Sequence, residues 1–444
     1  MTNPSIFMRN NFKKLLFLLL LFPIKTYAQS PVLSLEDALQ TALKNNFGIK
    51  TAQNDVQIAK NNAVKSNAGF SPIINLIATE TPSFGYLNQQ LSNGTEVSRT
   101  NLSNNLNAGV QLSMTLYDGK RMYLELDRLK ELQTLGEVNY RLRAEQLVFD
   151  VMRTYYNILR QQDLYKGLAE QIDLYEERFR LAQIRLEVGK GNQLDVLQAQ
   201  ADLNVQKTQL LRQKQAIQIA KLQLNQLMTN ADNFNFEVKD SLQVGKIYNL
   251  EELKNQAKNQ NLNVVQLQKL VGISMLNAKE FATLLKPRLT LNSGFTVGRQ
   301  DNSAGLFLVN QNGGLNAGVT LNYPIYDGGN IRRQIGNAQI EIESNKLRIQ
   351  QLQADLVNSL VISFQNYQNS LEILRGEEDN MQIAKQSIVI AMERFRLSRS
   401  TVLELKQIQQ TYETAVVRAV SAKADAKNAE VEMLRLSGGL LRNN

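Results

Sequence analysis

The sequence has no cysteine, no histidine and no tryptophan. These absences exclude thiol nucleophiles, imidazole bases, Ser-His-Asp constellations and metal sites built from Cys or His. A glycine-rich phosphate loop and a nucleophile–base pair are also missing, and the carboxylates occur singly on helical segments rather than as paired acid–base groups. We therefore expect that the protein is not an enzyme and has no cofactor and no metal ion.

A concentrated charge of one sign is lacking too. The formal net charge is +9, but four of the positive residues lie in the first 28 residues, where no acidic residue balances them. Without that segment only +5 remains, spread over the rest of the chain. Proteins that bind nucleic acid normally carry a concentrated basic surface, so we expect no nucleic-acid partner.

Long hydrophobic runs are absent, and the one short run has a clear context. The apolar stretch Leu15–Phe22 follows a basic start and is followed by Pro23 and a small residue at Ala28. This pattern predicts a signal peptide over residues 1–28, cleaved after Ala28. The run is well below the roughly 20 residues that a membrane-spanning helix needs. We expect an exported protein without a transmembrane helix.

An internal duplication organises the chain. The stretch LNAGVQLSMTLYDGK from Leu106 returns as LNAGVTLNYPIYDGG from Leu315, an offset of 209 residues. The same offset places RLEVGKGNQLDVLQAQ from Arg185 onto RFRLSRSTVLELKQIQ from Arg394. Segments further upstream match at an offset of 215, so one loop within 76–106 is longer in the first copy. Such length variation is typical of an exposed loop.

Each repeat is predicted to contain the same elements in the same order. The first repeat, residues 29–230, has a helix over about 35–68, strands over about 72–82 and 105–117, a long helix over 120–187, a turn at 189–192 and a return helix over 193–228. A linker follows at 231–249. The second repeat, residues 250–444, has a helix, strands over about 287–298 and 315–326, a long helix over 330–397, a turn at 398–401 and a return helix over 402–437.

Two periodicities support these elements. The helices show apolar residues at steps of three and four, and the second return helix carries a sustained heptad seam in which alanine predominates: Leu405, Ile408, Tyr412, Ala415, Ala419, Ala422, Ala426, Ala429, Met433 and Leu436. Small seam residues allow the helix axes to approach closely. The strands after Leu106, Leu315 and Leu289 alternate apolar and polar residues, whereas residues 73–80 alternate poorly.

Alternating strands of this length fit a transmembrane β-barrel and a soluble half-buried sheet equally well. The number of strands favours oligomerisation if the sheet lies in lipid. Four strands cannot close a barrel, since the smallest transmembrane barrels use about eight, and an open edge in lipid leaves backbone groups unpaired. Three chains would supply twelve strands, although the arithmetic also permits other multiples.

The signal peptide, the duplicated plan, the Tyr-Asp-Gly strand ends and the RLEVGKGNQLDVLQAQ turn together resemble the TolC-like outer membrane efflux proteins. The resemblance covers essentially the whole mature chain. It implies a mixed α and β membrane protein: a homotrimer with a twelve-stranded barrel in outer membrane lipid, continued into a long periplasmic α-helical coiled-coil barrel. It also implies a passive exit duct of a tripartite efflux or type I secretion system, docking to a periplasmic adaptor (membrane fusion protein) and an inner-membrane pump. The alternative is a soluble periplasmic coiled-coil adaptor or scaffold.

The resemblance also assigns places to particular residues. Extracellular loops would lie at about 81–104 and 299–314. The junction between barrel and helices would hold Tyr117, Asp118, Gly119, Tyr326, Asp327 and Gly328. The adaptor-docking tip would include Arg185, Gly189, Gly191, Arg394 and Ser398. The family's tip pattern of Arg, Gly and acidic residue fits the first repeat, whereas Ser398 replaces the glycine in the second.

A ring of acidic side chains closes the tip in some relatives, and the matching positions here are Glu404 and Gln407. We expect three Glu404 side chains to converge at the aperture, near Asp195, and to give cation selectivity. The competing interpretation is that Glu404 is an ordinary solvated charge on a coiled coil. The two tip arginines could equally be solvated with their stems over the apolar seam, and the Tyr-Asp-Gly repeats need no role beyond turn formation at a membrane interface.

Overall fold

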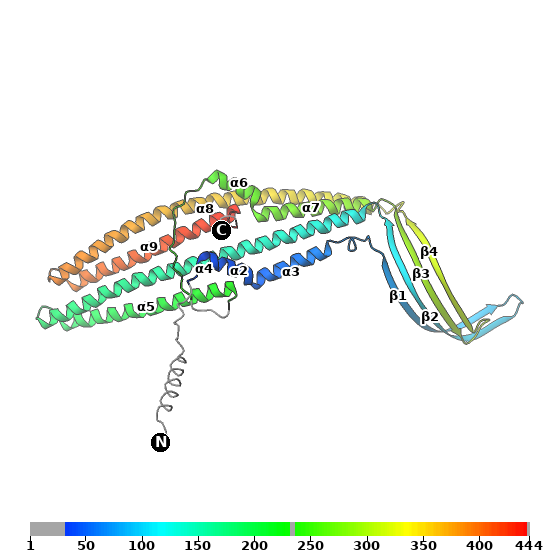
Figure 1. The fold of residues 1–444 in the computed structure, drawn as a ribbon, viewed down its shortest axis with the longest axis horizontal. Helices are drawn as coiled ribbons and strands as arrows, with labels where there is room; N and C mark the ends of the chain where they lie inside the picture. Colours follow the sequence, from blue (N-terminus) through cyan, green and yellow to red (C-terminus); the bar gives the residue numbers. More distant parts are fainter. Residues whose placement is uncertain (1–31, 231–235, 442–444) are drawn as a thin grey trace, which may run out of the picture.

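The computed structural model describes residues 32–230 and 236–441. The predicted signal peptide over residues 1–28 lies outside the described residues. The described chain is long and narrow, with its long helices running to one end and its strands forming the other (Figure 1). Within the two described ranges, no helix combines the length and the apolar character that crossing a bilayer requires. One four-stranded sheet and long helices agree with the expected mixed α and β fold.

The two repeats have the same elements in the same order. The first contains α2 (Leu35–Asn45), α3 (Phe47–Asn62), β1 (Ile73–Gln90), β2 (Glu96–Tyr117), α4 (Arg121–Glu187) and α5 (Gln193–Met228). The second contains α6 (Leu250–Gln260), α7 (Leu262–Thr283), β3 (Arg288–Asn302), β4 (Val309–Asn322), α8 (Asn330–Arg396) and α9 (Val402–Ser437). The return helices α5 and α9 span the residues that the sequence pattern indicates.

The single helix predicted over 35–68 is wrong, because Asn46 divides it and α3 ends at Asn62. The backbone of Asn46 is extended, with ψ of 128°, and its side-chain oxygen accepts hydrogen bonds from the amides of Gly48 and Ile49. One asparagine therefore ends α2 and caps the start of α3. Asn261 does the same between α6 and α7, where its side chain accepts from the Asn263 amide at 3.0 Å.

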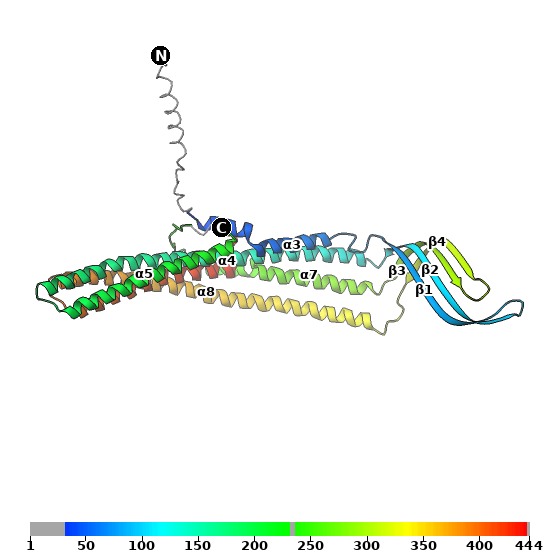
Figure 2. The same cartoon turned by 90° about the horizontal axis from the view of Figure 1, so that it is seen from below.

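The helices and strands form four columns that share one order. The packing contacts place α3 and α5 against α4, α4 against α7 and α9, and these two against α8 (Figures 1 and 2). The sheet has the order β1-β2-β3-β4. Each strand is connected in the chain to one helix of this layer: β1 to α3, β2 to α4, β3 to α7 and β4 to α8. The strands therefore follow the same order across the sheet as the helices do across the helical part. In the described ranges the molecule is thus a curved layer that ends at β1 on one side and at β4 and α8 on the other.

The strands are longer at their far ends than predicted. β1 pairs with β2 from Ile73–Ser113 up to Gln90–Glu96, and β3 pairs with β4 up to Asp301–Val309. Most of the segments predicted as loops at 81–104 and 299–314 is therefore paired strand. These segments are rich in Ser, Thr and Asn on both faces, so backbone pairing continues after the hydrophobic alternation has ended. β4 ends at Asn322 instead of 326, before Pro324, which has no N–H to donate to a ladder.

The two faces of the sheet differ in polarity. Directly paired residues share a face, so the register places Leu112 and Val319 on an apolar face and Gln111 and Asn316 on a polar one. Hydrogen bonds run across the polar face from Ser113 to Asn292 and on to Thr320. A bulge at Leu116 moves Tyr117 to the apolar face, opposite Leu289.

The largest hydrophobic core lies midway along the helices. It joins α2, α4, the end of α5, the segment after residue 236 and the C-terminal part of α9. The residues 236–242 of the predicted linker belong to this core, because Phe236, Val238 and Leu242 are buried. Burial raises the pKa of Tyr155 above its usual range, so its hydroxyl stays protonated and donates to Asp240 and to the carbonyl of Leu33. This bond fixes the linker to α4.

Candidate functional site

The tip of the molecule consists of two turns with the same backbone. In the first, the amides of Val188, Gly189 and Lys190 donate to the carbonyls of Ile184, Leu186 and Arg185. In the second, the amides of Leu397, Ser398 and Arg399 donate to the carbonyls of Glu393, Phe395 and Arg394. Each turn therefore closes its long helix with the same set of bonds. The two turns protrude side by side at the end remote from the sheet (Figure 2).

Both turns require a left-handed residue at the same place. Gly189 has φ of 71°, and Ser398 has φ of 59°. The serine that replaces the glycine thus adopts the glycine conformation, which is strained for a residue with a Cβ. Gly191 has a different constraint, since a Cβ there would lie 3.1 Å from the Cβ of Arg185.

The two arginines of the tip pattern make different contacts. The guanidinium of Arg185 lies 4.6 Å from the ring centre of Phe395 and 3.5 Å from the carbonyl of Ser400, both in the second hairpin. Arg394 donates to the carbonyl of Arg399 in its own turn at 3.5 Å, and it forms no ion pair with any residue that the structure describes. The first arginine therefore bridges the two hairpins, whereas the second closes its own turn.

The predicted aperture residues lie at the starts of the return helices. Glu404 forms a capping box with Thr401, in which the Glu404 amide donates to the threonine hydroxyl and the Thr401 amide donates to the carboxylate. Asp195 holds the equivalent position of α5, where its amide donates to Asn192. Within the described residues no hydrogen bond or ion pair joins Asp195 to Glu404. Gln407 is exposed one turn after Glu404.

The junction residues begin the long helices. Asp118 accepts a hydrogen bond from the Met122 amide, and Asp327 accepts bonds from the amides of Gly329 and Ile331. In both copies two successive left-handed residues separate this aspartate from its helix, and the first of them is Gly119 or Gly328. A Cβ at Gly119 would lie 2.7 Å from the Cβ of Lys286, so only glycine fits there. Tyr117 and Tyr326 are both exposed.

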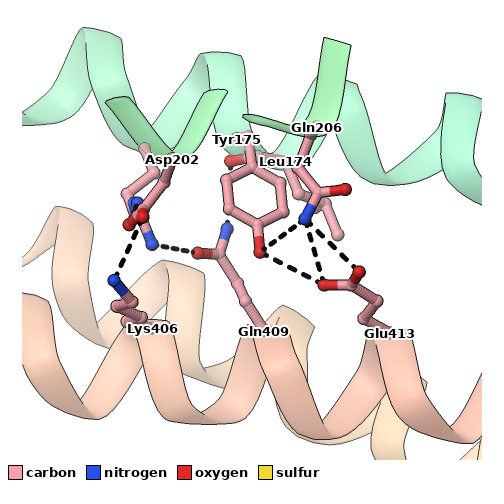
Figure 3. Close-up of polar contacts among 8 residues, drawn as sticks. Leu174, Tyr175, Asp202, Gln206, Lys406, Gln409 and Glu413 are labelled. Carbon is pink, nitrogen blue, oxygen red and sulfur yellow. Dashed lines mark hydrogen bonds and ion pairs between the residues drawn. The ribbon is translucent and has the colours of Figure 1, made fainter. Parts of the chain in front are cut away.

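A polar cluster that the sequence did not predict lies just above the tip. We call it the inter-hairpin network; it consists of Tyr175, Arg178, Asp202, Gln206, Lys406, Gln409 and Glu413. Figure 3 shows the contacts among these side chains. Arg178 is nine residues before the end of α4, or about 14 Å along the helix. The network joins α4 and α5 of the first hairpin to α9 of the second.

Arg178 is the centre of the network and is 0% exposed. Its guanidinium forms an ion pair with Asp202 and donates to the Gln409 side-chain oxygen at 2.7 Å. Lys406 bonds the other oxygen of Asp202 at 3.0 Å, so this carboxylate lies between two cations from different hairpins. Removing one partner of a buried ion pair strongly destabilises the folded protein, because it leaves an uncompensated charge in the interior.

The second half of the network is built around Glu413. Gln206 donates to both carboxylate oxygens, at 3.3 and 3.2 Å, and the Tyr175 hydroxyl donates at 3.4 Å. Burial, followed by the charge of Glu413, raises the pKa of Tyr175 to about 12, so this hydroxyl remains a donor at neutral pH. Two cations and two carboxylates balance one another in the network.

An outer ion pair also links the hairpins near the tip. Glu177 of α4 bonds Arg180 on its own helix at 2.7 Å and Arg396 of α8 at 3.1 Å. Hydrogen bonds from Arg180 first, and then from Arg396, lower the pKa of Glu177 to about 2. Together with the network, this pair makes the spacing of the hairpins depend on specific side-chain bonds. The arrangement binds the helices of the two hairpins together.

The duplication contains a signal that could have revealed the network. At the offset of 209 residues, Tyr175 corresponds to Ala384 and Gln206 to Ala415, and both alanines are buried in a hydrophobic cluster. Where one repeat has a large polar residue and the equivalent position of the other repeat has a small apolar one, the pattern indicates a polar contact that only the first hairpin makes. Periodicity alone does not show this, because both types occupy inward positions.

Comparison with known proteins agrees with this architecture. The family profile of the outer membrane efflux proteins matches residues 38–230 and 253–439, one match for each repeat. The outer membrane efflux protein BepC of Brucella suis is 20% identical over 414 residues, which cover 91% of this chain and 85% of BepC. The outer membrane protein TolC of Vibrio cholerae is 21% identical over 308 residues, 68% of this chain and 69% of TolC.

Solved structures show the same fold. The channel-forming protein CusC superposes with a TM-score of 0.74 at 15% identity, with 94% of this chain and 96% of CusC covered. The outer membrane protein VceC of Vibrio cholerae gives 0.70 at 16% identity, with 91% and 96% covered. Since the family profile covers both repeats, the chain belongs to the outer membrane efflux protein family, and it is a TolC-like exit duct of the outer membrane with its helices in the periplasm.

Proposed function

We propose that three copies of the chain close into one duct, with twelve strands in the outer membrane and a continuous ring of helices below them. The observation that carries this proposal is the four-column layer with a free edge on each side. β1 and β4 each have one unpaired side in the sheet. In lipid, unpaired backbone groups cost several kcal/mol each, so β4 of one copy would pair with β1 of the next.

The helices on the same two edges carry matching apolar faces. α5 packs against α4 and α2, and α8 packs against α6, α7 and α9. Exposed apolar side chains of α5 include Leu197, Val205, Leu211, Ile219 and Leu222. Exposed apolar side chains of α8 include Ile340, Leu347, Ile362, Ile373, Ile383 and Ile390. The α5 face of one copy would contact the α8 face of the next. Such contacts between two different faces form a closed ring when the rotation from one copy to the next divides a full turn evenly.

The tip would dock to the periplasmic adaptor, which links the duct to the inner-membrane pump. Four exposed apolar side chains surround the two turns: Val188, Leu194, Leu397 and Leu403. Their positions on paired helical turns suit a partner that presents its own apolar residues at a helix end. The duct itself would conduct passively, with energy supplied by the pump.

The mass of the purified particle tests the trimer. The protein would be extracted from the outer membrane in mild detergent and measured by light scattering with the detergent contribution subtracted. We expect a particle of three mature chains. A soluble monomer or dimer released by osmotic shock would contradict the proposal.

Glu404 would line the aperture of the closed tip and favour cations there. Its capping role and its charge can be separated, because Glu404→Gln retains a side-chain oxygen for the Thr401 amide. We expect this variant to assemble normally and to lose cation preference and block by trivalent cations in bilayer recordings. Unchanged selectivity and block in the variant would show that Glu404 acts only as a helix cap.

A further inference from the structure

The charged residues of the sheet are distributed unequally between its faces. The register pairs Asn75 with Gln111, Gln111 with Gly294, and Gly294 with Asn316, which defines the polar face. That face comprises the odd-numbered residues of 73–89 and 97–115 and the even-numbered residues of 288–302 and 310–322. It contains Arg99 and Arg288 and no acidic residue.

The acidic residues of the strands all lie on the opposite face. They are Glu80, Glu96 and Asp301. In the trimer proposed above, on which this inference rests, the apolar face contacts lipid and the polar face lines the lumen. The wall of the barrel lumen would then carry only positive charge, with Arg288 at its helix end and Arg99 near its outer end.

Arg288 borders a cavity of about 490 Å³ where the sheet meets the helices. The cavity opens on the polar face, since Thr115 and Asn322 line it together with residues from the start of α4 and the end of α7. Three carboxylates line the cavity. Asp118 accepts a hydrogen bond from the Met122 amide, and the other two are held in ion pairs. Glu280 pairs with Arg121 at 2.8 Å, and Glu125 pairs with Arg128 at 2.7 Å.

Two cations of the cavity have only neutral partners. Arg288 donates to the Thr115 hydroxyl at 3.3 Å, and Lys286 donates to the Gly119 carbonyl at 3.4 Å. Among the described residues, neither forms an ion pair. In each copy these two cations face one carboxylate outside an ion pair, Asp118, so the cavity keeps a net positive charge and three copies would repeat it around the lumen. A ring of basic side chains in a pore attracts anions.

We propose that this cavity is a luminal binding site for anionic groups such as carboxylates, sulfonates and phosphates, and that the barrel end of the duct favours acidic solutes. Arg288 is its principal binding residue, because it lies on the lumen face itself and its planar guanidinium can bind two oxygens of one anion. Lys286 adds a second charge at the edge. The aperture at the opposite end would carry the acidic Glu404, so the two ends of the duct differ in the sign of their charge.

Single-channel block tests the site. The purified protein would be inserted in planar bilayers, and pyrenetetrasulfonate would be added on the side of the barrel. We expect Arg288→Gln to raise the half-blocking concentration by about tenfold, because three charges leave the ring at once. Arg288→Lys should retain most of the block.

Arg299→Gln provides the matched control, since this arginine is on the same strand and pairs with Asp301 at 2.9 Å on the opposite face. The control should block like the wild type. Asn322→Asp tests the site without removing Arg288, because the register places the new carboxylate opposite it. It should weaken the block as well.

The outcomes separate this inference from the proposed function. Conducting channels in which Arg288→Gln and Asn322→Asp block like the wild type would overturn the anion site and leave the duct intact. An effect of equal size in Arg299→Gln would overturn it too, since general loss of charge would then explain the block. Purified wild-type protein that forms no channel would overturn the duct itself. If Arg288→Gln fails to assemble, the Asn322→Asp result decides.

Discussion

The two helical hairpins, α4–α5 and α8–α9, share a backbone and differ in what they bury at their contact. The turns at their ends form the same hydrogen bonds, and both place a left-handed residue after the long helix. The first hairpin contributes the large polar side chains Tyr175, Arg178 and Gln206 to the contact, whereas the second has alanine where two of these would be. Duplication thus preserved the geometry and left the side chains free to specialise.

This difference assigns separate roles to the two copies. A hydrophobic cluster that includes Ala384, Ala391 and Ala415 among larger apolar side chains packs α8 against α9 through non-directional contacts. The inter-hairpin network instead uses directional bonds between charged groups, which are satisfied at one spacing only. The contact between hairpins is therefore the place where a change of spacing breaks identifiable bonds.

Removal of the central arginine should have the largest effect. Arg178→Ala leaves Asp202 and Gln409 without their shared partner, and we expect the free energy of local opening at the tip to fall by about 3 kcal/mol. Hydrogen–deuterium exchange over residues 174–187 and 402–413 measures this. Arg180→Ala on the exposed side of α4 is the control and should change exchange far less; equal effects would mean that the network does not hold the hairpins together.

Swapping the residue types at positions 189 and 398 tests whether the two turns are equivalent. Gly189→Ser should destabilise the first turn by about 1 kcal/mol, since a Cβ is strained at this φ. Ser398→Gly should stabilise the second turn by roughly 0.5 kcal/mol or less, because relief of strain is partly offset by greater freedom in the unfolded chain. Hydrogen–deuterium exchange of the amides in the two turns measures both changes. Opposite signs are required, and a loss of stability in both variants would contradict the shared geometry.

The caps of the two return helices offer a smaller comparison. Thr401→Ala removes a capping box and Asn192→Ala removes a single side-chain bond, so each should destabilise the start of its helix by about 1 kcal/mol or less. We expect the loss at Thr401 to be the larger one. Amide exchange of the first turn of α5 and α9 would show the order. A larger loss at Asn192 would mean that the reciprocal bond of Glu404 adds no stability.

The outer ion pair should give the smallest effect and a definite pH dependence. Because the folded-state pKa of Glu177 is lowered to about 2, its contribution is present above the unfolded pKa of about 4.3 and is lost as the pH falls towards 2. With its partners exposed, the contribution is roughly 0.5 kcal/mol after solvent screening. Hydrogen–deuterium exchange at the tip should differ between the wild type and Glu177→Gln at pH 6, and the difference should disappear as the pH falls through about 2. A constant difference would exclude this titration as the cause.

The sequence predicted the repeat plan because duplication makes each copy a check on the other. The turn at Gly189 and the one at Ser398 could be located to the residue, since their flanking helices align at a constant offset. The helix break at Asn46 was missed, because a capping asparagine inside an apolar pattern does not interrupt the pattern. The paired ends of β1 and β2 were missed because polar residues on both faces carry no periodic signal.

The candidate site was only partly predictable for a similar reason. Arg185 and Glu404 lie a few residues from the two turns. Once the turns are located in the sequence, these residues can be placed at the tip without knowledge of the tertiary structure. The inter-hairpin network depends on which side chains meet across α4, α5 and α9, and residues 174–206 and 406–413 are far apart in the sequence. The alternation of apolar and polar residues predicts that the sheet has one apolar and one polar face. That no acidic residue of the strands lies on the polar face can be seen only when the pairing register of the four strands is known.

The order of the four strands has a consequence for how quickly the molecule can form. β1 and β2 are joined by the short turn after Leu91, and β3 and β4 by an equally local connection, so each hairpin can form within about microseconds. β2 and β3 must wait for synthesis of the second repeat, because Ser103 pairs with Asn302 across about 200 residues of chain. The seam between β4 and β1 of neighbouring chains has no covalent connection at all. Only this last step should accelerate with protein concentration, which makes it the point at which assembly can stall when few copies reach the membrane.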